Sequence, residues 1–107
     1  MGAITTRDEL VRVFRDAPIP LERVILFGSR ARGDHLSDSD WDVLVVSPAF
    51  KGMRYIERLA LLYSSLSLRR VEYVALTPEE WAERREEIGT IGEASREGII
   101  LYEFGKT

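Results

Sequence analysis

Apolar residues along this chain fall into short unbroken runs and into helically spaced sets, and the two patterns alternate. The unbroken runs predict strands at residues 23–27, 41–46 and 69–76. The run at 41–46 is almost entirely apolar, as expected of a strand in the buried centre of a sheet. Apolar spacing and capping residues predict helices at residues 6–17, 53–66, 79–87 and 90–98, with a short helical start near Arg30. This order predicts an α/β (α+β) fold, a small mixed sheet with helices packed against it.

The predicted helix at 79–87 differs from the others because it carries charge on most of its faces. We expect a solvated helix in which Glu80 and Arg84, one turn apart, form an ion pair. Trp81 and Ile88 are seven positions apart and so share one side of a helix. At that spacing large apolar residues pack more often than they stack on a base, and we expect both to be buried.

Composition sets limits on the class of protein. The chain has 107 residues, 45% hydrophobic and 31% charged, which predicts one globular domain over residues 1–107. It contains no cysteine, so disulfides and thiolate metal sites are excluded. No apolar run approaches the ~20 residues of a membrane span, and residues 1–10 lack the apolar core of a signal peptide. A net charge of −3 argues against binding duplex nucleic acid. We therefore expect a cytoplasmic protein that binds neither a membrane nor a duplex.

The most informative stretch is residues 28–46, where a Gly-Ser pair is followed by two closely spaced carboxylates. Asp40 and Asp42 open the second predicted strand, and side chains two apart on a strand share one side. They would lie about 6–7 Å apart at ~3.3 Å per residue. Carboxylates so close repel unless a cation lies between them, and hard divalent cations such as Mg²⁺ prefer oxygen ligands. The pattern predicts a metal-dependent phosphoryl- or nucleotidyl-transfer site.

Gly28, Ser29, Arg30 and Arg32 are candidate phosphate ligands. Glycine lets the backbone approach a phosphate closely, and a serine hydroxyl and neighbouring N–H groups can donate to its oxygens. Arginine donates two parallel hydrogen bonds from a planar fork. The alternatives are an ordinary strand-to-helix turn, with the two arginines facing water or pairing with acids such as Asp34.

Gly28-Ser29, ten residues and then Asp40-Trp41-Asp42 resemble the signature of the DNA polymerase beta-like nucleotidyltransferase superfamily. The short chain is similar to its smallest members, the minimal nucleotidyltransferases, over residues 23–76. In that family a third carboxylate stands on a later strand in an apolar setting, and Glu72 fits this position. Such proteins often have Asp there, and the longer Glu makes this position the least secure of the three.

The resemblance implies an activity and a set of roles. It implies transfer of a nucleoside monophosphate, AMP from ATP, to an acceptor hydroxyl. Asp40, Asp42 and Glu72 would be catalytic and would hold two Mg²⁺ ions. It also implies a toxin–antitoxin system, in which the nucleotidyltransferase neutralises a HEPN-domain partner, in some cases by adenylylating it.

Two other functions stay open at this point. One is a nucleotide-binding or partner-neutralising module without turnover, which the intact set of Asp40, Asp42 and Glu72 argues against. The other is an enzyme that modifies nucleic-acid ends, which the negative net charge argues against. The single histidine, His35, has no second His or Cys for a zinc site. Trp41 alternates away from the two aspartates and should pack in the core.

The carboxyl-terminal segment is richer in apolar residues than a terminal strand beside a charged helix needs. These residues are Ile99, Ile100, Leu101, Tyr102 and Phe104. An exposed apolar edge commonly marks an interaction surface. We therefore expect another protein or a second copy of the chain to supply the acceptor. The alternative is that this segment closes the domain's own core against the amino-terminal helix.

Overall fold

A computed structural model of the chain describes residues 6–36 and 39–105. The helices are α1 (Arg7–Arg15), α2 (Ser29–Arg32), the 3-10 turn η1 (Pro48–Phe50), α3 (Tyr55–Ser65), α4 (Pro78–Arg84) and α5 (Thr90–Glu97). The strands are β1 (Arg23–Phe27), β2 (Trp41–Val46), β3 (Val71–Leu76) and β4 (Ile99–Glu103). The two strands beside the Gly-Ser turn, β1 and β2, have the bounds that their apolar runs predict.

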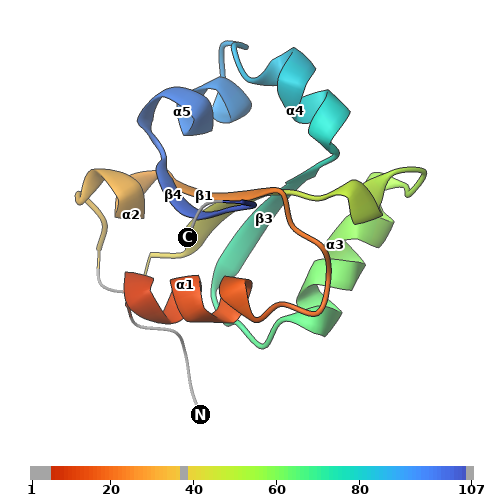
Figure 1. Cartoon of the computed structure of the whole chain (residues 1–107). Coiled ribbons are helices and arrows are strands. Elements are labelled where there is room, and N and C mark those ends of the chain that lie inside the picture. The colour runs from red at the N-terminus through yellow and green to blue at the C-terminus, as the bar shows by residue number, and fades with distance from the viewer. Residues whose placement is uncertain (1–5, 37–38, 106–107) are drawn as a thin grey trace.

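The four strands form one mixed sheet in the order β3-β2-β1-β4. β2 runs parallel to β3, whereas β1 is antiparallel to both β2 and β4. Helices α1 and α3 cover one face of the sheet, and α4 and α5 cover the other (Figure 1). The predicted α/β fold with a mixed sheet is confirmed.

β2 lies in the centre of this arrangement and separates two apolar cores. Val43 and Val45 pack toward α1 and α3, and Leu44 and Val46 pack toward α4 and α5. All four side chains are completely buried. A strand with cores on both faces needs apolar residues at consecutive positions, which is why its sequence does not alternate.

The charged helix departs from its prediction in two ways. α4 ends at Arg84, so Ile88 lies beyond it and is fully exposed, while Trp81 is buried as expected. Glu80 does not pair with Arg84; it accepts two hydrogen bonds from Arg58 of α3, at 2.6 and 3.1 Å. Arg58 is buried, and a buried guanidinium needs a carboxylate more than an exposed arginine does.

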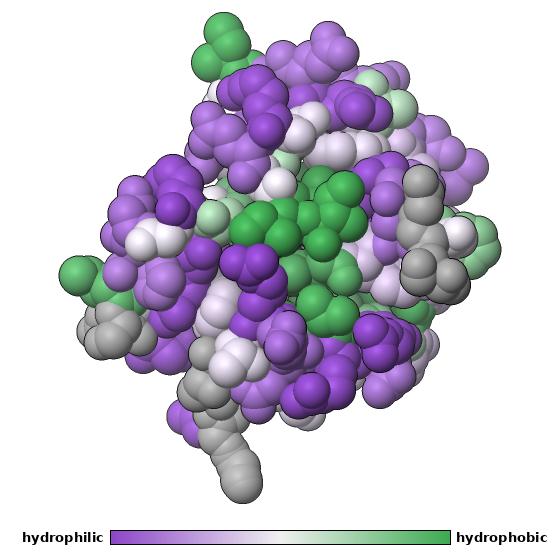
Figure 2. All heavy atoms as spheres, turned by 60° about the vertical axis from the view of Figure 1, so that its left-hand side comes forward, coloured by the Kyte–Doolittle hydropathy of each residue, from purple (hydrophilic) through white to green (hydrophobic). Residues whose placement is uncertain are grey.

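β4 is an edge strand with one buried side and one exposed side. Leu101 is buried in the core beneath α1, as expected if this segment closes the domain's own core. Ile100 and Phe104, in contrast, are 52% and 74% exposed. Figure 2 shows an apolar patch on the face that carries β4, surrounded by polar residues. Across the described ranges, no helix is long and apolar enough to span a membrane.

Candidate active site

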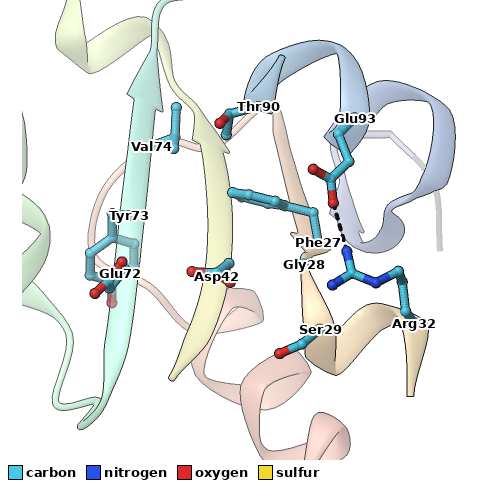
Figure 3. A pocket seen from close by; sticks show the side chains of 10 residues that line it. All are labelled: Phe27, Gly28, Ser29, Arg32, Asp42, Glu72, Tyr73, Val74, Thr90 and Glu93. Carbon is cyan, nitrogen blue, oxygen red and sulfur yellow. Dashed lines mark hydrogen bonds and ion pairs between the residues drawn. The ribbon is translucent and has the colours of Figure 1, made fainter. Parts of the chain in front are cut away.

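A cavity of about 470 Å³ opens at one end of the sheet, between the strand ends, α2 and the start of α5 (Figure 3). Its lining combines apolar residues with acids, a base and hydroxyls: Phe27, Gly28, Ser29, Arg32, Asp42, Glu72, Tyr73, Val74, Thr90 and Glu93. Five of the seven predicted site residues are among them. The two others are Asp40 and Arg30.

The sheet itself brings Asp42 and Glu72 together. They are register partners in the parallel pair of β2 and β3, so they stand side by side on one face of adjacent strands (Figure 3). Neighbouring strands lie about 4.8 Å apart, within the reach of two ligands of one metal site. Glu72, which the family resemblance predicts as the third carboxylate, lies beside Asp42 in this arrangement.

Burial and neighbouring negative charges raise the pKa values of two carboxylates in this site, Asp42 and Glu72, and the Arg32 guanidinium offsets the shift at Asp42 only in part. The pKa of Asp42 is raised by burial first, and then by the negative charges of Asp40 and Glu93. The pKa of Glu72 is raised by partial desolvation, by a hydrogen bond with Asp40 and by the charges of both aspartates. Acids that raise one another's pKa attract any cation that reaches them.

Gly28 is required where it stands because the backbone passes directly against Asp42. Its φ of +77° lies in the region that side chains rarely adopt. A Cβ added there would collide with the Asp42 carboxylate. The glycine therefore lets the Gly-Ser turn and the carboxylate share one small space, which places Ser29 at the edge of the same cavity.

Asp40 lies just before β2 and is not among the lining residues. Its carboxylate is 3.8 Å from the Arg70 guanidinium, and its interaction with Glu72 keeps it next to the site. Within residues 6–36 and 39–105, no three acidic or histidine side chains converge closely enough to hold a metal. Carboxylates close together repel one another unless a cation lies between them. The donor set, all carboxylate oxygens, fits Mg²⁺.

The two arginines after the Gly-Ser pair lie in different environments. Arg30 donates to the Ser39 carbonyl from Nε and Nη2, at 3.0 and 2.8 Å, and stacks 4.3 Å from the Trp41 ring. In this structure its guanidinium braces the loop before β2, and its phosphate contact stays a prediction. Arg32 does line the cavity.

Sequence reasoning missed the contribution of α5. Glu93 and Thr90 line the cavity, and Glu93 forms an ion pair with Arg32 at 3.0 Å. The two residues of this pair are 61 positions apart in the chain, and no local pattern connects them. His35 is exposed and is not among the lining residues.

Comparison with known proteins agrees with this geometry. A family model described as nucleotidyltransferase domain matches residues 7–96, and the chain belongs to this family. The resemblance carried by the Gly-Ser and Asp-x-Asp elements is thereby confirmed. Nucleotidyltransferases of this family generally use divalent metal ions.

A curated relative and solved structures extend the comparison. A Methanocaldococcus jannaschii protein named "Putative protein adenylyltransferase" is 49% identical over 47 residues, which are 41% of this chain. The chain spans about half the length of that relative, 48%. A crystal structure described as a "putative nucleotidyltransferase" from Sulfolobus solfataricus is 27% identical, with a TM-score of 0.63, covering 94% of this chain and 78% of that one.

A toxin–antitoxin complex with AMP-PNP shows the same fold at a TM-score of 0.58 and 22% identity. The match covers 94% of this chain and 75% of that one. A mutant of a toxin–antitoxin pair matches over the same shares, at 21% identity and a TM-score of 0.58. At this identity the likeness shows the fold alone.

Proposed function

We propose that residues 1–107 form one nucleotidyltransferase domain that uses Mg²⁺ to transfer AMP from ATP to an acceptor hydroxyl. The observation that carries this proposal is the placement of Asp42 beside Glu72, directly against the Gly28-Ser29 turn. The carboxylate pair, which can bind a cation, and the Gly-Ser turn, whose backbone a phosphate can approach closely, line the same cavity of about 470 Å³. Nucleotidyl transfer needs both, because a triphosphate and carboxylates repel each other without metal.

Asp40, Asp42 and Glu72 are the residues that would hold the metal, as two ions. When bound, Mg²⁺ neutralises phosphate charge and makes the acceptor hydroxyl easier to deprotonate. Ser29 offers a hydroxyl donor and Arg32 a guanidinium to the phosphate oxygens, both from α2 at the cavity wall. These groups hold the phosphate chain in one orientation, which is the main contribution a protein makes to this reaction.

We further propose that the acceptor hydroxyl belongs to a partner protein of the HEPN type, in a toxin–antitoxin pair. The name of the Methanocaldococcus relative, a protein adenylyltransferase, and the toxin–antitoxin matches support a protein acceptor. The cavity also supports it, because among the described residues it is not fully enclosed and leaves room for an acceptor beside Asp42 and Glu72.

Labelled ATP tests the proposal. Purified protein is incubated with Mg²⁺, with ATP labelled at the α- or the γ-phosphate, and with a HEPN-type protein from the same organism. We expect label from the α-phosphate, and none from the γ-phosphate, on the partner. Transfer of γ-label would indicate a kinase. Mg²⁺-dependent ATP binding without any transfer would instead support the binding module.

A further inference from the structure

Arg32 is held by two carboxylates that belong to different parts of the chain. Its Nε lies 3.2 Å from Asp34 Oδ2, and its Nη1 lies 3.0 Å from Glu93 Oε2. Asp34 follows directly after α2, whereas Glu93 reaches across from α5 and lines the cavity. Figure 3 shows the Glu93 carboxylate above the guanidinium, and the remaining nitrogen directed toward the side of the cavity that holds Ser29 and Asp42.

This arrangement orients a flexible side chain before any ligand arrives. The Arg32 side chain is 46% exposed, so packing alone does not hold it. Fixing a long, flexible arginine side chain in one rotamer costs conformational entropy. Because two ion pairs already fix the Arg32 guanidinium, part of this entropy is lost before the ligand binds and does not weaken its binding.

Apart from its ion pair with Arg32, Glu93 is in an electrostatically unfavourable position. Its charge faces Asp42 and adds to the negative charge of a cavity meant for a polyanion. A role in stability alone would be small, since ion pairs between exposed side chains contribute little to the free energy of unfolding. The Glu93 side chain is 33% exposed and Arg32 is 46% exposed, so this pair falls in that class.

We propose that Glu93 is a positioning residue that holds Arg32 in the orientation in which it binds the triphosphate of MgATP. This proposal rests on the proposed function for the identity of the ligand. Glu93 acts through Arg32, and α5 is thereby part of the nucleotide site although it carries none of the motif residues.

A double-mutant cycle tests the proposal, with the affinity for MgATP measured by calorimetry and kcat and KM measured in the transfer assay. The variants are Glu93→Gln, Arg32→Ala and the double variant. Glu97→Gln is the matched charge control, because Glu97 lies one turn further along α5, is exposed, and acts on the Arg32 charge without the ion pair that Glu93 forms. We expect Glu93→Gln to weaken MgATP binding about 5–10-fold, as a 1.4 kcal/mol difference is tenfold. kcat should change less than KM, and Glu97→Gln should bind like the wild type.

The cycle gives the decisive result. In the Arg32→Ala background, Glu93→Gln should cause no further loss of affinity, because the residue through which it acts is gone. An equal loss in both backgrounds would overturn the proposal, and so would a lowered melting temperature with unchanged affinity. If the two substitutions are coupled in their effect on MgATP affinity but no transfer occurs, the role of Glu93 stands and the proposed transferase activity is overturned. A wild-type protein that does not bind MgATP would overturn both.

Discussion

Asp42 and Glu80 are partly buried acids at opposite ends of the parallel strand pair, and their surroundings are opposite. Glu80 accepts two hydrogen bonds from the buried Arg58, which lower its pKa together with the cap it forms at Thr77. Asp42 lies beside Asp40 and Glu93, and burial with these charges raises its pKa.

The difference separates a structural carboxylate from the one we propose as a metal ligand. Arg58 also donates to the Ala75 carbonyl, at 3.1 Å, so the Glu80 pair fastens α3 and α4 to the end of β3. The raised pKa of Asp42, from burial and then from neighbouring like charges, means that its ionised form opposes folding. The proposed cation would remove this cost.

The largest effect is expected from Asp42→Asn, which removes one negative charge at nearly constant shape. Transfer activity should fall at least about 100-fold, since even loss of a group behind a metal ligand costs 10–100-fold. The metal-free variant should be as stable as the wild type or more so, because repulsion with Asp40 is relieved. Steady-state kinetics and urea unfolding measure the two effects, and wild-type turnover in the variant would show that Asp42 is not catalytic.

Glu72→Gln should damage transfer as severely if Glu72 completes the metal site. Glu72→Asp is the matched control, because it keeps the charge and shortens the side chain to the residue that such proteins often carry. We expect the Asp variant to keep most of the activity, measured under the same conditions. A mild effect of Glu72→Gln would remove Glu72 from the ligand set and leave the two aspartates.

Glu80→Gln makes the same acid-to-amide change in the structural region, and its effect should have the opposite sign. The free energy of unfolding should fall by about 1–2 kcal/mol, the range for hydrogen bonds to charged groups reduced for partial exposure. The Glu80 side chain is 37% exposed and Arg58 is 10% exposed. Activity should remain at the wild-type level at temperatures where the variant is folded. Loss of activity in the folded variant would contradict the assignment of Glu80 to a purely structural role.

The smallest effects should appear in the pH dependence of stability, measured by urea unfolding in chelator. Glu80 has a folded pKa below its ordinary value of 4.5, so it stabilises the protein above that pH. This contribution is lost as the pH falls through the lowered folded pKa. Asp42 has a folded pKa above its ordinary value of 3.8, so its destabilising effect is relieved as the pH falls through the raised pKa. At pH 7, Glu80→Gln should therefore lower the free energy of unfolding and Asp42→Asn should raise it. Both changes in the free energy of unfolding should become smaller in acid.

Local patterns predicted the parts of this molecule that depend on neighbours in sequence. The strands β1 and β2 follow from apolar runs, and Asp42 follows from its two-residue spacing to Asp40. Gly28 was predicted to allow a close approach to a phosphate, and the group that lies directly against it in the structure is the Asp42 carboxylate.

Long-range contacts account for what the sequence did not reveal. Glu80 was assigned to Arg84 because they are one helical turn apart, but its partner Arg58 is 22 residues away. Glu93 and Arg32 are 61 residues apart, and their contact exists only because α5 packs over the end of β1. Arg30 and Arg32 look equivalent in sequence, and only the fold shows that one stacks on Trp41 and the other lines the cavity.

The most direct test of the account is calorimetry of ATP binding to the wild-type protein, with Mg²⁺ and with excess chelator. The cluster of acids around Asp42 should repel a triphosphate until a divalent cation joins them, so we expect binding in Mg²⁺ and none in chelator. Equal affinity for ATP in the two conditions would contradict the assignment of this end of the sheet as a metal-dependent nucleotide site.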